Sequence, residues 1–266
     1  MNLSDEQIAA FGRDGYLFFP QLFSREEIEG LRRDLPDLLA QPGPEVVRER
    51  DDPEAVRLVY GADAVAPSYH RMSRHPRLLG PVRQLTGEEV YIHQTRLNPK
   101  LDYGGGTWDW HQDFGSWHRA DAMPAPRAIM TAIFLDDATA ANAPLLIVPG
   151  SQHHGLVQEV NQDDVSGYVL HVIDRPTLGA LVAEGGLVPL TGPAGSVCFL
   201  HCNIVHGSSN NITPLRRAIW YVNYNAVSNA CQNLERAQHH NNRDHSPLTP
   251  LSDDCLLASE DATVGA

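Results

Sequence analysis

The sequence predicts a mostly β protein with flanking α-helices, whose core is a double-stranded β-helix of the jelly-roll, cupin-like type. Two observations lead to this prediction. The first part of the chain contains segments whose apolar residues recur at helical spacing. From residue 88 onward, short segments alternate apolar and polar residues, with turn residues between them. Helices followed by many short strands are typical of helices that pack outside an antiparallel sandwich or barrel.

Two capping-box patterns mark the N-terminal helices. Ser4 is followed three residues later by Gln7, and Ser24 by Glu27, each ahead of apolar residues on a helical stripe. Pro36 is expected to end or kink the second helix. A short strand is predicted in residues 15–19, a loop in residues 42–55 and a short helix in residues 75–87.

The strands of the predicted core follow one another after residue 88. They are predicted in residues 89–99, 126–137, 144–150, 195–201 and 217–227. We expect one domain over residues 1–266: a helical N-terminal part over about 1–87, a jelly-roll core over about 88–228 and a polar, turn-rich tail over about 229–266.

Composition excludes several classes of partner. The 266 residues carry a formal net charge of −13 and no cluster of Lys and Arg, so nucleic acid is not an expected partner. The chain has no apolar run of about 18 residues and no signal peptide, so no membrane partner is expected. The four cysteines lack zinc-type pairing and predict reduced thiols in a cytoplasmic protein. No oligomeric state follows from the sequence.

A histidine and a carboxylate stand two residues apart in "GGGTWDWHQDFGSWH", at His111 and Asp113. If this segment is a strand, both side chains point to the same face. Together with His206 from a distant segment, they could bind one face of an octahedral Fe(II) and leave positions open for a cosubstrate and oxygen. The alternative is a surface histidine on a polar strand.

Two further features favour the metal site. Arg216 and Arg217 follow His206 by about ten residues, and an arginine suits the second carboxylate of a 2-oxoglutarate cosubstrate. Polar residues also alternate along the strand predicted in residues 89–99, at Gln94, Arg96 and Asn98, which indicates either a lined pocket or an exposed sheet face.

The sequence resembles the phytanoyl-CoA dioxygenase family of Fe(II)/2-oxoglutarate-dependent oxygenases, in the branch of ectoine hydroxylase and the hydroxylases of free amino acids. The resemblance extends over most of residues 8–227 and includes "FGRDGYLFFPQLFSREEIEGLR", "TWDWHQDFGSWH", "MPAPRAI" and "IFLDDATAANAPLLIVPGSQ". The three glycines of residues 104–106 then predict a flexible approach to the rim of the pocket.

The resemblance implies a role for each matching residue. The iron ligands, which form the catalytic centre, would be His111, Asp113 and His206. The residues that contact the cosubstrate would be Gln94, Asn98, Ser208 and Arg217, with Arg216 as the alternative arginine. The residues that contact the substrate would be Arg96, Trp117 and Met130. Arg96 matches an arginine that holds a substrate carboxylate. Met130 stands where the ectoine enzymes carry a small polar residue, so ectoine itself is not the expected substrate.

The resemblance also implies the reaction. With Fe(II), 2-oxoglutarate and O2, the enzyme would hydroxylate an unactivated C–H bond of a small, carboxylate-bearing, amino-acid-like substrate. The carboxylate of Asp113 favours hydroxylation, because related halogenases lack it. Three alternatives stay open: a non-catalytic jelly-roll protein that binds metal and 2-oxoglutarate, an oxygenase of a larger natural-product intermediate, and a zinc hydrolase.

Overall fold

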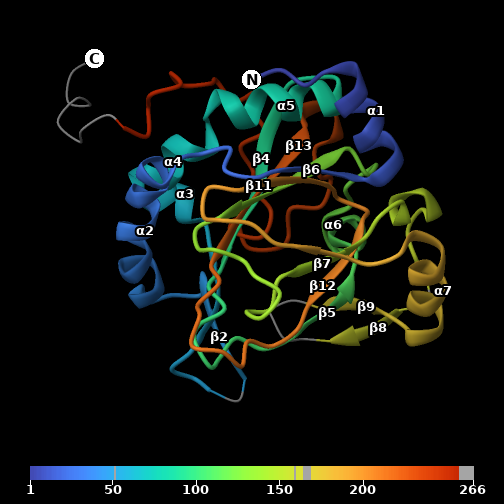
Figure 1. The fold of residues 1–266 in the computed structure, drawn as a ribbon. Coiled ribbons are helices and arrows are strands. Elements are labelled where there is room, and N and C mark those ends of the chain that lie inside the picture. The colour runs from blue at the N-terminus through green and yellow to red at the C-terminus, as the bar shows by residue number, and fades with distance from the viewer. Residues whose placement is uncertain (51, 159, 164–168, 258–266) are drawn as a thin grey trace.

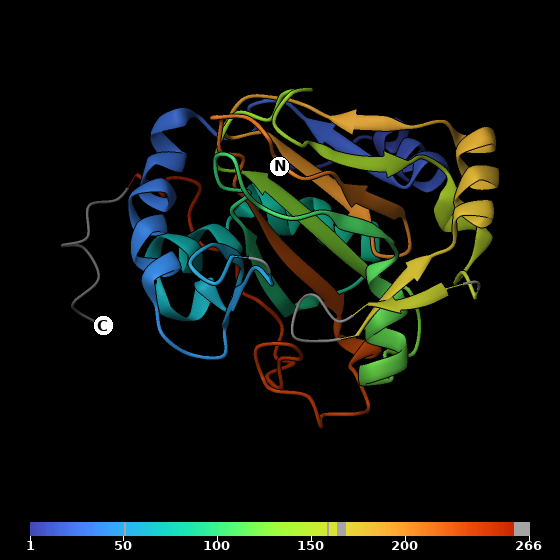
Figure 2. The same ribbon diagram turned by 90° about the horizontal axis from the view of Figure 1, so that it is seen from below.

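Two antiparallel β-sheets that face one another form the core of the protein (Figures 1 and 2). The computed structural model describes residues 1–50, 52–158, 160–163 and 169–257. In order, the larger sheet contains β1 (Tyr16–Phe19), β11 (Val197–His201), β6 (Ala128–Phe134), β13 (Ile219–Ala226), β4 (Val90–Asn98), β3 (Val56–Tyr60) and β2 (Val46–Arg48). The smaller sheet contains β10 (Val188–Leu190), β7 (Leu145–Val148), β12 (Val205–Ser208), β5 (Trp108–His111), β9 (Leu170–Ile173) and β8 (Val160–Asp163).

The larger sheet is buried on both faces, as the alternating residues of β6 show. Met130 and Phe134 pack in the cluster between the two sheets. Ile129 and Ile133 point the other way, into a cluster formed with the helices. Those helices are α1 (Asp5–Asp14), α2 (Arg25–Ala40), α3 (Ala62–Val65), α4 (Pro67–Ser73) and α5 (Pro76–Thr86). The predicted class, a jelly-roll core with flanking helices, is confirmed.

The N-terminal helices begin where the capping boxes predict. The Ser4 and Ser24 side chains accept the backbone N–H groups of Gln7 and Glu27, and both reciprocal bonds are formed. The helix α2 does not end at Pro36 but continues to Ala40. A proline inside a helix costs about 3 kcal/mol, and here the fully buried Leu35 and Leu38 hold both sides of it against the core.

Several elements differ from the sequence prediction. The stretch 42–55 was expected to be a loop but contains β2, which pairs with β3. Residues 1–87 therefore supply three strands to the larger sheet as well as helices. The segment around His111 is not one strand, because β5 ends at His111 and a helix, α6 (Asp113–Asp121), begins two residues later. The short strands β8, β9 and β10 and the helix α7 (Arg175–Gly185) were not predicted.

The C-terminal tail lies against the larger sheet. Its described part has one short 3-10 turn, η2 (Val227–Asn229), and otherwise irregular backbone. The Asn242 N–H donates to the His93 carbonyl at 3.0 Å, the Leu248 N–H donates to the Val90 carbonyl at 3.0 Å, and Leu248 is buried in the core. The tail therefore covers part of β4; residues 258–266 lie outside the described residues.

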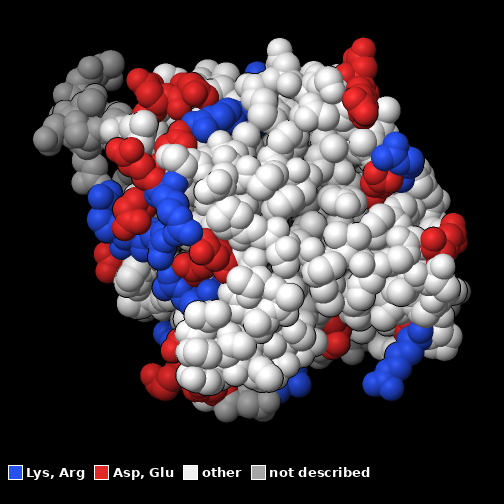
Figure 3. Space-filling model, viewed as in Figure 1, with Lys and Arg blue, Asp and Glu red and all other residues white. Residues whose placement is uncertain are grey.

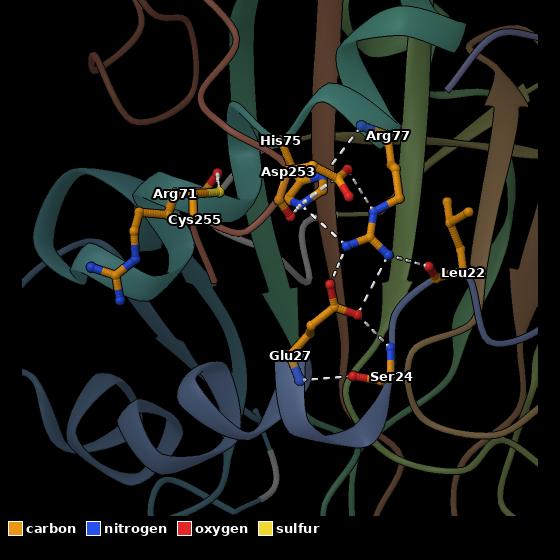
Figure 4. A network of polar contacts seen from close by, with 8 residues as sticks. All are labelled: Leu22, Ser24, Glu27, Arg71, His75, Arg77, Asp253 and Cys255. Atoms are coloured by element: carbon orange, nitrogen blue, oxygen red, sulfur yellow. Dashed lines mark hydrogen bonds and ion pairs between the residues drawn. The ribbon is translucent and has the colours of Figure 1, made fainter. Parts of the chain in front are cut away.

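A polar network joins the tail to the N-terminal helices (Figure 4). The guanidinium of Arg77, at the start of α5, donates to the Leu22 carbonyl at 2.8 Å and to the Asp253 carboxylate at 3.1 Å. It also forms an ion pair with Glu27, the capping-box residue of α2. One side chain thus fixes α2, α5 and the tail relative to one another.

Charged groups on the face in Figure 3 gather mainly on the side where α2 lies, with blue and red atoms intermixed. The protein's ion pairs include Arg25 with Asp137 and Arg216 with Asp136, both with a nitrogen–oxygen distance of 2.8 Å. This face therefore shows no broad basic field. Within the part of the chain that the structure describes, no helix is long and apolar enough to cross a bilayer.

We predict that Arg77→Met lowers the free energy of unfolding by about 2 kcal/mol, because three acceptors lose a charged donor in a partly buried setting. The matched control is Arg25→Met, which removes an exposed ion pair and should change the free energy by about 0.5 kcal/mol or less. Urea unfolding followed by circular dichroism measures both. Equal losses in the two variants would contradict the role given to Arg77.

Candidate metal centre

Three buried side chains with metal-binding groups meet between β5 and β12. His111 is the last residue of β5 and lies directly opposite His206 of β12 in the antiparallel ladder. Asp113 is the first residue of α6. The ligand atoms of the three residues lie within 4.8 Å of one another, and the His111 Nε2 is 3.3 Å from an Asp113 oxygen. Two imidazoles and one carboxylate form the ligand set of a facial triad.

The sequence argument for bringing His111 and Asp113 together was wrong in one respect, since the two residues do not share a strand. The backbone turns at Gln112, and its side chain holds that turn in place. The Gln112 amide donates to the carbonyls of Gly155 and Asn203 at 2.9 and 2.8 Å, and accepts the Val157 N–H at 2.9 Å. The buried amide therefore fixes the geometry that strand periodicity was expected to supply.

Backbone carbonyls orient both imidazoles. The Nδ1 of His111 is 2.6 Å from the Asp109 carbonyl, and that of His206 is 3.1 Å from the Ile204 carbonyl. A carbonyl only accepts, so Nδ1 of each ring is the donor in these bonds, and Nε2 is the nitrogen available to a metal. Burial, followed by the neighbouring His111, lowers the pKa of His206 to about 3, which keeps that imidazole neutral.

Arg96 supplies the positive charge for Asp113. Its guanidinium, on β4 of the opposite sheet, contacts both carboxylate oxygens, one of them at 3.2 Å. Burial by itself would raise the pKa of Asp113, but the Arg96 charge and then His111 hold it well below its usual range. Asp113 is therefore ionised, as a metal ligand must be.

A small cavity of about 20 Å³, close to the volume of one water molecule, adjoins His111 and His206. Six of the residues singled out in the sequence line it, and Asp113 contacts two of these six, His111 and Arg96. The lining consists of Arg96, Asn98, Trp108, His111, Leu145, His206, Gly207, Ser208, Arg217 and Tyr221. The side-chain amide oxygen Oδ1 of Asn98 is buried and has no hydrogen-bond partner among the described residues.

The two neighbouring arginines point to different places. Arg217 is 1% exposed, lines the cavity, and donates twice to the Ala143 carbonyl at 3.0 and 2.6 Å. Arg216 forms a bidentate ion pair with Asp136, at 2.8 and 3.0 Å, in a different pocket. Only Arg217 of this pair faces the triad's cavity.

The remaining predicted residues, Trp117, Met130 and Gln94, do not line this cavity. Trp117 of α6 and Met130 of β6 belong to one apolar cluster between the sheets. Trp117 also packs edge-on against His93, with ring centroids 4.9 Å apart. Gln94 donates to the His240 carbonyl of the tail at 2.8 Å, and it lines a separate, larger cleft.

Sequence reasoning missed two residues of β13. Tyr221 lies opposite Arg96 and lines the cavity, and Asn223 lies opposite both Gln94 and Met130. Asn223 is fully buried, and neither polar atom of its amide has a hydrogen-bond partner among the described residues. The signal was present in "YVNYN", where polar and aromatic residues alternate with apolar ones in a strand predicted to be buried.

A second buried group contains His93, Asp121 and Cys231. Here the two ring nitrogens of His93 face different partners, each 3.8 Å away: Nδ1 faces Cys231 and Nε2 faces Asp121. Arg236 already binds both oxygens of Asp121. The His93 ring therefore lies between Cys231 and Asp121.

A jelly-roll that presents two histidines and a carboxylate at one end of its smaller sheet defines the class of mononuclear iron oxygenases with a facial triad. The phytanoyl-CoA dioxygenase (PhyH) model matches residues 11–219. The chain therefore belongs to the phytanoyl-CoA dioxygenase family, and it is a dioxygenase. The resemblance seen in the sequence is confirmed.

Individual relatives cover most of the chain. The L-proline trans-4-hydroxylase of Streptomyces griseoviridis is 37% identical over 256 residues, covering 92% of this chain and 95% of the relative. An ectoine dioxygenase of Bordetella parapertussis is 37% identical over 238 residues, covering 85% and 77%. The crystal structure of EctD from S. alaskensis with 2-oxoglutarate and 5-hydroxyectoine superposes with a TM-score of 0.83, at 34% identity, covering 94% of this chain and 87% of EctD.

We predict that Arg96→Met lowers the free energy of unfolding of the metal-free protein by about 3 kcal/mol at neutral pH, because Asp113 is left as a buried charge without a partner. In the variant, burial raises the pKa of Asp113. The loss should therefore shrink as the pH falls below that raised pKa and the carboxyl becomes neutral. Urea unfolding at a series of pH values, with Arg216→Met as control, measures this. A loss that does not change with pH would contradict the pairing.

Proposed function

We propose that the protein is an Fe(II)- and 2-oxoglutarate-dependent hydroxylase that acts on an unactivated C–H bond of a free or modified amino acid. The observation on which this rests is the buried set of His111, Asp113 and His206, with Arg217 in the same cavity. A hydrolase that uses zinc-bound hydroxide needs no such arginine.

The proposed iron ligands are the His111 and His206 Nε2 atoms and the Asp113 carboxylate. The His206 imidazole is neutral and the Asp113 carboxylate is ionised, which suits a donor set for a divalent cation. Iron bound there would supply the oxidative chemistry, as it reacts with O2 and the cosubstrate. The EctD structures include one with bound Fe, at 34% identity and a TM-score of 0.81.

The proposed cosubstrate contacts surround the same cavity. Arg217 would pair with the far carboxylate of 2-oxoglutarate, as an always-charged, bidentate donor. Ser208 and Asn98 line the cavity beside it, and the Asn98 side-chain oxygen, which has no partner within the described part of the chain, is a polar group available to a ligand. Gln94 is proposed as a further contact, which requires its amide to leave the His240 carbonyl.

The proposed substrate is small and carries a carboxylate. Arg96 would hold that carboxylate once a metal has taken over part of the charge of Asp113, with Trp117 and Met130 forming the apolar wall. The proline hydroxylase relative matches this chain over nearly its full length, which favours a free amino acid. The bulky Met130, fully buried, argues against ectoine.

We propose the cytoplasm as its location. All four cysteines are free thiols, although the chain places Cys198 and Cys202 only four residues apart. Unpaired, buried cysteines are typical of proteins in reducing compartments.

We predict that anaerobic addition of Fe(II) and 2-oxoglutarate gives a weak visible charge-transfer band, and that His111→Ala abolishes it by removing a ligand. The control is His154→Ala, which changes a partly exposed histidine of a surface ion pair and should leave the band intact. Succinate release in air with candidate amino acids then tests turnover. If neither the band nor succinate appears, the protein is not an oxygenase; the band without turnover would indicate a binding protein.

We predict that Arg217→Ala raises the 2-oxoglutarate concentration needed for half-maximal succinate release by about 30-fold, the equivalent of about 2 kcal/mol for a lost buried charge partner. Arg216→Ala should raise it by less than about threefold, because Arg216 is engaged with Asp136. The reverse order would assign the cosubstrate to Arg216.

A further inference from the structure

Lys100 is the single lysine among the 266 residues, and it is buried, with 2% of its surface exposed. It follows Asn98, the last residue of β4, by two positions. A lysine buried to this degree is rare unless it has an ionic partner.

The ammonium of Lys100 connects two segments beside the cavity. It donates to the Gly106 carbonyl and, at 2.6 Å, to the Ser209 carbonyl. Ser209 directly follows Ser208, which lines the cavity. The Gly106 N–H also donates to Glu49 at 2.7 Å. The glycine segment, which the sequence predicted to be a flexible approach, is thus fixed at Gly106 from two sides.

Two buried basic side chains, Lys100 and Arg217, belong to neighbouring segments beside the cavity. The Arg217 backbone N–H donates to the Lys100 carbonyl at 3.0 Å, and within the described part of the chain the Arg217 guanidinium donates to the Ala143 carbonyl alone. Among the described residues, no carboxylate lies within 4.0 Å of either charge. A third cation, Arg57, is by contrast paired with Glu49 at 2.9 Å.

A positive charge on Lys100 or on the Arg217 guanidinium is therefore not balanced by a carboxylate of the described residues. Burial of a charge is costly unless an opposite charge accompanies it. Burial, followed by Arg217 and Arg57, lowers the pKa of Lys100 to about 6, against a smaller opposing effect of Glu49. An anion that entered the cavity beside Arg217 would favour the charged form of Lys100.

We propose that Lys100 is a positioning residue for the cosubstrate: it fixes the segments on either side of the cavity and, with Arg217, provides the positive charge that the far carboxylate of 2-oxoglutarate neutralises. Lys100 does not itself line the cavity, so it acts through Arg217 and Ser209. This inference rests on the proposed function, because it takes 2-oxoglutarate as the anion.

A purely structural role makes a different prediction. If Lys100 only joined two loops, its charge state would not depend on which ligand is bound. The electrostatic role requires a response to the far carboxylate specifically. 2-Oxobutanoate separates the two, because it keeps the metal-chelating 2-oxo acid end and lacks the far carboxylate.

The single lysine permits a direct measurement. Protein labelled with 13C at the lysine ε-carbon and loaded with diamagnetic Zn(II) gives one side-chain signal, whose pH titration reports on Lys100 alone. We expect saturating 2-oxoglutarate to raise the pKa of Lys100 by about one unit or more, and 2-oxobutanoate to leave it unchanged. Equal pKa values with both ligands would overturn the proposal. This NMR titration needs no variant and does not depend on turnover.

Two variants complete the test by calorimetry. Lys100→Met, which keeps the chain length without the charge, should weaken 2-oxoglutarate binding about tenfold and 2-oxobutanoate binding less than about twofold. Lys100→Arg should retain most of the 2-oxoglutarate affinity. Equal weakening for both ligands would show a structural role only. If wild-type protein with metal bound no 2-oxoglutarate at all, the proposed function would be at fault, rather than the role of Lys100 within it.

Discussion

The ion pair between Arg96 and Asp113 is the contact on which the rest of the centre depends. The pair links the two sheets electrostatically. The guanidinium is on β4 of the larger sheet, and the carboxylate is at the start of α6, beside the smaller sheet. Without a cation, a fully buried carboxylate would be costly, and it would take up a proton. The pair keeps Asp113 ionised and holds α6 against β4, which also places Trp117 in the interior.

The fold could be predicted from the sequence where local signals agree with the tertiary structure. The capping boxes of Ser4 and Ser24 place the first helices, and alternation places β4, β6 and β13. Short elements escaped detection because three or four residues carry too little pattern, as in β2. The helix α6 was missed because its burial of polar Asp113 and Ser116 obscures the amphipathic period that a sequence argument needs.

The centre was predictable in its residues and less so in its geometry. Chemistry and resemblance together pointed to His111, Asp113 and His206, which the structure brings within 4.8 Å. Their proximity nevertheless depends on the Gln112 amide and on the β5–β12 register, both of which are tertiary. Asn223 was overlooked because an asparagine in a strand gives no local sign of whether it bonds a neighbour or faces an interior space.

The direct opposition of His111 and His206 in the ladder has a thermodynamic consequence. A slip of one residue would turn every side chain of the strand to the other face, so the register that buries the apolar residues of β5 and β12 also sets the spacing of the imidazoles. The conformational entropy of assembling the ligands is then lost during folding of the sheet rather than on metal uptake. The spacing of the two imidazoles is accordingly preorganised by the sheet, and its entropic cost is part of the cost of folding.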